Sequence, residues 1–229
     1  MKAMSDSEND ERGILVSDFD GTMTRNDFYK LIISSLLPAD VPDYWAQYRA
    51  GELTHFEGLK AYFGSIRASE AEVLQIVRRM ELDPQLPSAV QSLRNAGWRV
   101  VITSAGCDWY IQWLLKSVGL DLEVHSNPGR FVEGQGLVME LPVGSPFLSP
   151  TIGVDKAAVV RSYVQQGKTV AFAGDGFPDV APARLVSADR RFARGDLASV
   201  LRSENAGFHS FDVWSDIARR LLSSPWGTP

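Results

Sequence analysis

The sequence of 229 residues contains a single cysteine, Cys107, and only three histidines, which lie far apart along the chain. One cysteine excludes an intrachain disulfide, and it excludes a zinc cluster built from several thiolates. No run of about 18 apolar residues occurs, so no membrane-spanning helix is predicted. Lys and Arg number 23 against 28 Asp and Glu, and the formal net charge is −5. Because broad nucleic-acid binding usually needs a basic surface, that class of function is not expected.

The segment 1–12 is polar and acidic, and it lacks the basic and then apolar order of a signal peptide. We predict that it is the disordered tail of a cytoplasmic protein that binds neither membranes nor nucleic acids. The whole chain is 45% hydrophobic and 22% charged, a composition typical of a globular protein with a sizeable core. Nothing in the pattern indicates an oligomeric state.

Short apolar runs alternate with helical patterns along much of the chain. Buried strands are predicted at 13–20, 98–103 and 169–173, with shorter candidates at 120–124, 185–188 and 207–211. Helices are predicted at 88–96 and 157–166. Strands that alternate with helices in this way indicate an α/β fold with an open, parallel central sheet.

Two stretches interrupt this alternation. The first contains no convincing strand and shows helical patterns at 28–37, 44–50, 56–66 and 69–80, where Ser69 and Glu72 have the spacing of a capping box. The second, 127–153, is rich in Gly and Pro, and its segments 129–133 and 136–141 are predicted to pair as a hairpin. We therefore expect a core made of residues 13–26 and 85–225, with a helical cap of residues 27–84 inserted after the first strand.

The acidic pentapeptide Asp18-Phe-Asp-Gly-Thr22 follows the first predicted strand directly. Ligands of open parallel sheets bind beyond the carboxyl ends of the strands, so polar residues there are the first candidates for a site. Two carboxylates so close together repel each other unless a cation or a shared proton compensates. A hard cation bound by oxygen atoms fits this requirement. An isolated Asp-x-Asp is more often a plain acidic loop, and the pair alone does not define a site.

Three further polar segments follow, each at a predicted strand end or helix start. They are Thr103-Ser-Ala-Gly106, Lys156 at the start of a helix, and Gly174-Asp-Gly-Phe-Pro-Asp179. Taken singly, each has an ordinary explanation as a turn hydroxyl, a surface lysine or an acidic loop. The last segment is similar to a dinucleotide-binding loop, but its final acid would repel a pyrophosphate and suits a metal ion instead.

In this order the four segments resemble the motifs of the haloacid dehalogenase superfamily of phosphatases, over roughly residues 13 to 220. The first motif is the most specific of the four. The resemblance implies a Rossmann-like core and a Mg²⁺ ion. It also implies hydrolysis of a small phosphorylated metabolite through an aspartyl-phosphate intermediate.

The resemblance also implies a role for each residue of the motifs. Asp18 is the expected nucleophile, and Asp20 is the expected general acid and base. The residues expected to hold the phosphoryl group are Gly21, Thr22, Ser104, Ala105 and Lys156. The expected metal ligands are Asp18, Asp20 through its backbone carbonyl, Asp175 and Asp179. Thr103 competes with Ser104, which we favour by its place before Ala-Gly. Pro178 replaces an asparagine that is frequent in the family.

The position of the cap resembles the phosphoserine phosphatase-like branch of the superfamily. Within this branch, Asn26-Asp27, Thr103 to Asp108 and Phe192-Ala-Arg194 resemble the phosphatases of methionine salvage. Phosphoserine is disfavoured as the substrate because the cap segment 56–63 contains Lys60 but no arginine, although Arg49 and Arg67 lie nearby.

The sequence leaves several hypotheses about the function open. A phosphoserine phosphatase is one alternative, and a phosphotransferase or phosphomutase is another. A non-catalytic relative that only binds phosphorylated ligands is a third. The aromatic residues of the cap and those after Cys107 more often fill a core than line a pocket; these are Tyr44, Trp45, Tyr48, Tyr62, Phe63, Trp109, Tyr110 and Trp113.

Overall fold

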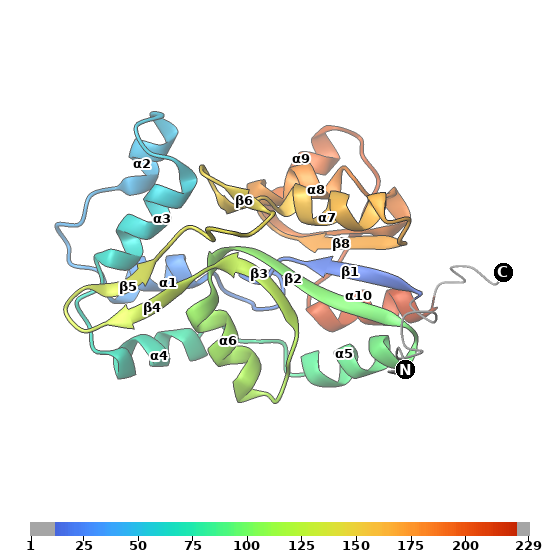
Figure 1. The fold of residues 1–229 in the computed structure, drawn as a ribbon, viewed down its shortest axis with the longest axis horizontal. Coiled ribbons are helices and arrows are strands. Elements are labelled where there is room, and N and C mark those ends of the chain that lie inside the picture. The colour runs from blue at the N-terminus through green and yellow to red at the C-terminus, as the bar shows by residue number, and fades with distance from the viewer. Residues whose placement is uncertain (1–11, 224–229) are drawn as a thin grey trace, which may run out of the picture.

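A six-stranded sheet forms the centre of the molecule in the computed structural model, which describes residues 12–223 (Figure 1). All neighbouring strands pair in parallel, in the order β10-β9-β8-β1-β2-β3. The strands are β1 (Gly13–Ser17), β2 (Trp98–Cys107), β3 (Glu123–Asn127), β8 (Val170–Gly174), β9 (Arg191–Ala193) and β10 (His209–Ser210). The predicted α/β fold with a parallel sheet is confirmed. Except for Arg12, the predicted disordered tail lies outside the described residues.

Helices cover both faces of the sheet (Figure 1). On one face lie α7 (Lys156–Gln165), α8 (Val180–Ala183) and α9 (Gly195–Ser203). On the other lie α5 (Leu86–Asn95), α6 (Asp108–Ser117) and α10 (Trp214–Ser223). Side chains of β1 alternate between the two faces, because Ile14 and Val16 pack into one buried cluster and Leu15 into the other. This burial on both faces explains why β1 is apolar throughout.

The central place of β1 determines where a ligand is expected. The chain proceeds from β1 to β2 and β3 on one side and later to β8, β9 and β10 on the other. The direction of winding therefore reverses at β1, and open sheets bind their ligands at the carboxyl ends of the strands beside such a reversal. The loops after β1, β2 and β8 meet at this edge.

Four helices lie between β1 and α5 in the chain: α1 (Phe28–Ser35), α2 (Tyr44–Arg49), α3 (His55–Gly64) and α4 (Glu70–Arg78). The predicted capping box at the start of α4 is confirmed, since Ser69 and Glu72 exchange hydrogen bonds. A hairpin of β4 (Gly129–Val132) and β5 (Gly136–Met139), also as predicted, packs against α3. The helical segment is thus extended by a hairpin from a distant part of the chain. The exact domain limits stay a prediction.

Two short segments differ from the predicted pattern or add to it. The strand predicted at 185–188 is wrong, because these residues form the turn after α8 and the strand lies at Arg191–Ala193 instead. The Arg191 side chain donates to the carbonyls of Ala183 and Val186, which satisfies the end of α8 without a strand. A small pair, β6 (Leu148–Ser149) and β7 (Gly153–Val154), directly precedes α7.

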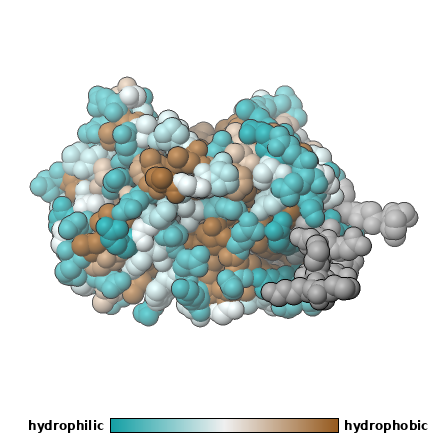
Figure 2. Space-filling model, viewed as in Figure 1, coloured by the Kyte–Doolittle hydropathy of each residue, from teal (hydrophilic) through white to brown (hydrophobic). Residues whose placement is uncertain are grey.

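The surface mixes polar and apolar residues. In the face drawn in Figure 2, hydrophilic residues cover most of the outline and hydrophobic ones occur as separate patches. Among residues 12–223, no helix has the length and apolar character that crossing a membrane requires.

Asp83 connects the end of the helical segment to the start of α10, and it yields a stability prediction. Its side chain is buried and accepts the N–H groups of Gln85 at 2.8 Å and Ser215 at 2.7 Å. We expect Asp83→Ala to lower the free energy of unfolding by about 1–3 kcal/mol, because two N–H groups lose their acceptor. Urea unfolding measures this change. Asp83→Asn keeps one acceptor and should lose less, and the exposed control Asp40→Ala should change by less than about 0.5 kcal/mol. Equal losses in Asp83→Ala and Asp40→Ala would contradict this role.

Candidate active site

The carboxyl end of β1 leads through Asp18 into a tight turn closed on the carbonyl of Phe19. Gly21 in this turn has a φ of +68°, and a Cβ on it would lie 2.3 Å from Oδ2 of Asp175. The N–H of Gly21 donates to Oγ1 of Thr24 at 3.1 Å, and the N–H of Thr22 donates to a carbonyl of the same turn at 3.2 Å. Both N–H groups are therefore engaged within the turn, and the phosphate-binding roles expected of Gly21 and Thr22 stay predictions.

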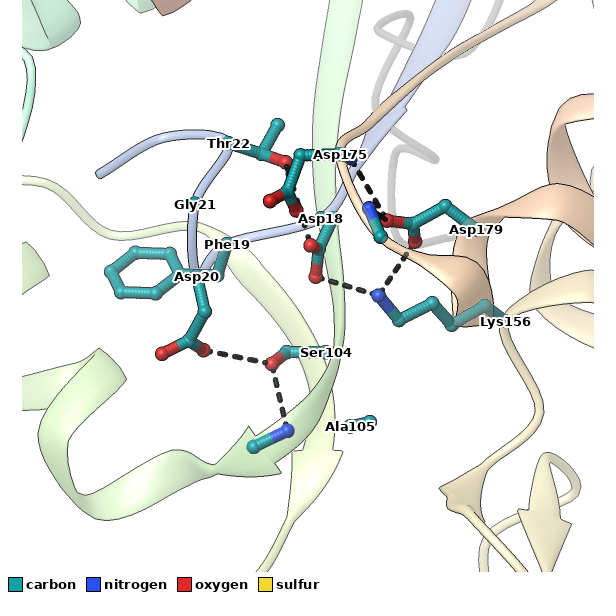
Figure 3. A network of polar contacts seen from close by, with 12 residues as sticks. Asp18, Phe19, Asp20, Gly21, Thr22, Ser104, Ala105, Lys156, Asp175 and Asp179 are labelled. Atoms are coloured by element: carbon teal, nitrogen blue, oxygen red, sulfur yellow. Dashed lines mark hydrogen bonds and ion pairs between the residues drawn. The ribbon is translucent and has the colours of Figure 1, made fainter. Parts of the chain in front are cut away.

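Three carboxylates and one ammonium group meet at the edge of the sheet (Figure 3). Asp18, Asp175 and Asp179 each place one carboxylate oxygen within 4.8 Å of the others. Nζ of Lys156 lies 2.6 Å from Oδ1 of Asp18 and 2.7 Å from Oδ1 of Asp179. Lys156 is only 3% exposed. The ordinary explanation of this residue as a surface lysine is therefore wrong. Residues predicted from three separate motifs are thus in direct contact.

The positive charge of Lys156 does not balance the charges of the three carboxylates around it. Burial raises the pKa of Asp18 well above its usual value, and the charges of Asp179 and Asp175 raise it further, while Lys156 acts to lower it. Burial also raises the pKa of Asp175, to about 7. For Lys156, burial acts to lower the pKa, but the adjacent Asp179 and Asp18 outweigh it and raise the pKa. When all three carboxylates are ionised, they face one ammonium group, and a single divalent cation would offset the two negative charges that remain. Hard cations such as Mg²⁺ prefer this donor set of oxygen atoms.

Asp179 differs from the other two acids in its hydrogen bonds. Its Oδ2 accepts the N–H groups of Asp175 at 3.0 Å and Gly176 at 2.9 Å, while Oδ1 accepts from Lys156. The side chain therefore shapes the loop after β8 and fixes the lysine. Asp18 and Asp175 accept fewer hydrogen bonds and are the more available carboxylates for a metal ion.

The Asp20 carboxylate points away from this group, toward the end of β2 (Figure 3). Its Oδ2 accepts from the Tyr110 hydroxyl at 2.8 Å and from Oγ of Ser104 at 3.4 Å, and Oδ1 accepts the N–H of Phe28 at 3.2 Å. Burial, and then the charge of Asp27, raises the pKa of Asp20 to about 6. A carboxyl group that titrates near neutral pH is suited to both giving and taking a proton. The Asp20 side chain lies apart from the cluster of Asp18, Asp175 and Asp179. Only the backbone carbonyl of Asp20 therefore stays a candidate metal ligand.

The loop after β2 distinguishes Ser104 from Thr103. Oγ of Ser104 faces Asp20 and accepts the N–H of Gly106 at 2.9 Å. Oγ1 of Thr103 is buried and has no hydrogen-bond partner among the described residues. Ala105 is anchored by its carbonyl, which accepts from Nδ2 of Asn127 at 2.8 Å. Of the two hydroxyls, Ser104 is the one that lies beside Asp20.

Two side chains in this region were not identified from the sequence as parts of the site. Tyr110 was expected to fill a core, and its contact with Asp20 spans 90 residues of chain. Arg194 donates to the carbonyl of Gly21, to that of Thr24 at 2.6 Å and to that of Asp212 at 2.7 Å. It thereby fixes the turn after β1 against the segment before α10. No spacing or periodicity in the sequence signals either contact.

Cys107 takes no part in this arrangement. Its thiol is fully buried, and burial raises its pKa to about 12. A thiol in this state is a poor nucleophile, and Cys107 packs in the core instead.

Comparison with curated proteins finds relatives along nearly the whole chain. Two of them, from Microcystis aeruginosa and Brevibacillus brevis, are named 2-hydroxy-3-keto-5-methylthiopentenyl-1-phosphate phosphatase. The first is 28% identical over 91% of this chain and 97% of its own length. The second is 24% identical over 91% and 94%.

Solved structures show the same fold. A haloacid dehalogenase family hydrolase from Salmonella enterica serovar Typhi has a TM-score of 0.64 at 20% identity, covering 87% of this chain and 67% of that one. A phosphoserine phosphatase from T. onnurineus has a TM-score of 0.62 at 17% identity, covering 97% and 99%. The fold and the enzyme class predicted from the sequence are confirmed. A sequence model of the haloacid dehalogenase-like hydrolase family matches residues 15–184, and the chain belongs to this family.

Proposed function

We propose that this protein is a Mg²⁺-dependent phosphomonoester hydrolase that acts on a small phosphorylated metabolite through an aspartyl-phosphate on Asp18. The observation that carries the proposal is the separation of the two acids of the first motif. Asp18 lies among charged groups with Lys156, whereas Asp20 lies among hydroxyl and N–H donors. The surroundings of Asp18 suit a nucleophile that must approach an anionic phosphate. The surroundings of Asp20 suit a group that exchanges a proton.

The reaction proceeds in two displacements at phosphorus. In the first, a carboxylate oxygen of Asp18 bonds to phosphorus while the bond to the substrate oxygen breaks, and Asp20 gives its proton to that oxygen. In the second, Asp20 takes a proton from a water molecule, whose oxygen bonds to phosphorus. The bond to Asp18 then breaks, and inorganic phosphate leaves. Each acid returns to its starting state.

The remaining residues hold the phosphoryl group and the metal. Lys156 and the hydroxyl of Ser104 offer donors to the phosphoryl oxygens, together with the backbone of Ala105. Asp18, Asp175 and the backbone carbonyl of Asp20 would bind Mg²⁺, and Asp179 orients the loop that carries Asp175. When bound, the ion supplies positive charge that stabilises the phosphoryl oxygens.

The substrate is proposed to be the compound in the names of the curated relatives, 2-hydroxy-3-keto-5-methylthiopentenyl-1-phosphate. Phosphoserine is less well supported because the two arginines nearest to segment 56–63 in the sequence each have a partner within the cap. Arg49 pairs with Asp43 at 3.4 Å, and Arg67 donates to carbonyls of the cap. The cytoplasmic location and the absence of nucleic-acid partners stay predictions from the sequence.

Replacement of the nucleophile tests the mechanism. Asp18→Asn should abolish release of phosphate from p-nitrophenyl phosphate, a loss of at least about 10³-fold, because no covalent intermediate forms. Its unfolding midpoint should stay close to that of the wild type. Wild-type-like turnover in this variant would refute the mechanism. Release of phosphate by the wild type without an added acceptor distinguishes hydrolysis from phosphoryl transfer.

Metal binding is tested by stability as well as by activity. EDTA should abolish activity, and Mg²⁺ should restore it. Mg²⁺ at about 100 times its dissociation constant should stabilise the wild type by about 2.7 kcal/mol, since the ion binds only the folded chain. Asp175→Asn should lose this stabilisation, whereas the exposed control Asp40→Asn should retain it. Thermal unfolding with and without Mg²⁺ measures both, and an equal shift in Asp175→Asn would exclude that residue as a ligand.

A matched pair of variants separates the two hydroxyls after β2. Ser104→Ala should lower kcat/KM by about 10- to 100-fold, because a donor to the phosphoryl group is lost, at a typical value of 1.5–3 kcal/mol. Thr103→Val replaces an unpaired buried hydroxyl by a methyl group of similar shape. It should leave kcat/KM within about twofold and should not lower stability. The opposite ranking in steady-state assays would assign the role to Thr103.

A further inference from the structure

The Tyr110 side chain lies on α6, three residues after β2, and its hydroxyl contacts Asp20 at 2.8 Å. The side chain is 1% exposed. We propose that Tyr110 is a positioning residue that fixes the Asp20 carboxylate for proton transfer to the leaving group. This inference rests on the proposed function, because it requires Asp20 to act as the general acid and base.

The hydroxyl makes the shortest hydrogen bond that Asp20 receives. Ser104 lies farther away at 3.4 Å, and it is also bonded to the N–H of Gly106. Oδ1 of Asp20 accepts the N–H of Phe28 at 3.2 Å. One donor from the core and one from the first residue of the cap helix α1 therefore hold the two carboxylate oxygens. Two such contacts at opposite oxygens fix the plane of the carboxylate, which a single contact cannot do.

The structure also reserves space for this pair at Gly106. A Cβ on Gly106 would lie 1.8 Å from the Tyr110 hydroxyl oxygen and 2.9 Å from Oδ2 of Asp20. The hydrogen bond thus occupies the place of the missing side chain. The Tyr110 ring packs against Phe28, with centroids 4.5 Å apart, and against the edge of Phe63 at 6.3 Å. Phe28 and Phe63 belong to the cap and hold the ring, while Asp20 accepts from the hydroxyl. Both ends of the Tyr110 side chain are therefore fixed.

A simpler explanation is that a buried hydroxyl only needs an acceptor. The chain contains a matched case that separates the two explanations. Tyr163 is also buried, at 6% exposed, and donates to Oε1 of Glu123 at the same distance of 2.8 Å. It lies about 10 Å along α7 from Lys156, given the 1.5 Å rise per residue of a helix. Tyr163→Phe therefore removes a similar hydrogen bond without touching Asp20.

The test compares two leaving groups in the full-length enzyme with Mg²⁺. Expulsion of p-nitrophenolate needs little proton donation, whereas expulsion of an alkoxide depends on it. Tyr110→Phe should lower kcat/KM for glycerol 2-phosphate by about tenfold or more, a part of the 10²–10⁴-fold that general acid catalysis contributes. We compare kcat/KM because it reports the first displacement, in which the leaving group departs, and not the hydrolysis of the aspartyl-phosphate that both substrates share. For p-nitrophenyl phosphate the loss in kcat/KM should stay within about threefold, and Tyr163→Phe should change neither value beyond about twofold. Both substrates are assayed on one preparation, so their ratio does not depend on the fraction folded.

A double-mutant cycle shows whether Tyr110 acts through Asp20. Asp20→Asn should cause a larger loss of the same leaving-group selectivity, and Tyr110→Phe should add nothing further in that background. An unselective loss in Tyr110→Phe beside a selective one in Asp20→Asn overturns the positioning role alone. A full multiplicative loss in the double variant overturns it as well. An unselective loss in Asp20→Asn overturns the role of Asp20 in the proposed function, and the inference about Tyr110 with it.

Discussion

Lys156 places one positive charge between two buried carboxylates, those of Asp18 and Asp179. Removing charged groups from water costs several kcal/mol per ion, so acids in this position are stable only beside a counter-charge. The lysine is the first residue of α7, and the acids come from the loops after β1 and β8. Three segments far apart in the chain must therefore meet, and the parallel sheet with β1 at its centre is what brings them together. A single ammonium group does not neutralise the site, and this deficit is what favours a divalent cation.

The same constraint explains why the two acids of the first motif have different surroundings. Asp18 and Asp20 are two residues apart, and in an extended strand their side chains would share one face. The turn after β1 begins between them and directs Asp20 toward β2 and α6, away from Lys156 (Figure 3). Asp20 is thereby left with neutral donors from the core and from α1. The chain thus separates a group that must stay charged from one that must exchange a proton, as expected where two carboxyl groups have distinct roles.

The sequence predicts the fold well where burial alone determines it. The apolar runs at β1, β2 and β8 are strands buried on both faces, and their ends define the site. The strand predicted at 185–188 is wrong because an apolar pair in a turn looks the same in sequence as one in a short strand, and here Arg191 satisfies the carbonyls of Ala183 and Val186. Tyr110 and Arg194 were not predicted as parts of the site because neither belongs to the four motifs, and their contacts join residues 90 and 173 positions apart. Lys156 and Asp18 are also far apart in the chain, but the resemblance of their motifs predicted both residues.

The glycines of the motifs carry a different kind of information. A Cβ at Gly21 would meet the carboxylate of Asp175, and one at Gly174 would lie 2.5 Å from Cγ of Asp179. At Gly106 it would meet Tyr110 and Asp20. Only Gly21 of these three has a positive φ, so backbone conformation alone does not explain the other two. Each glycine provides volume that a neighbouring side chain occupies, which is an acid at Gly21 and Gly174 and chiefly Tyr110 at Gly106. The motifs therefore specify the polar side chains of the site together with the space in which those side chains must lie.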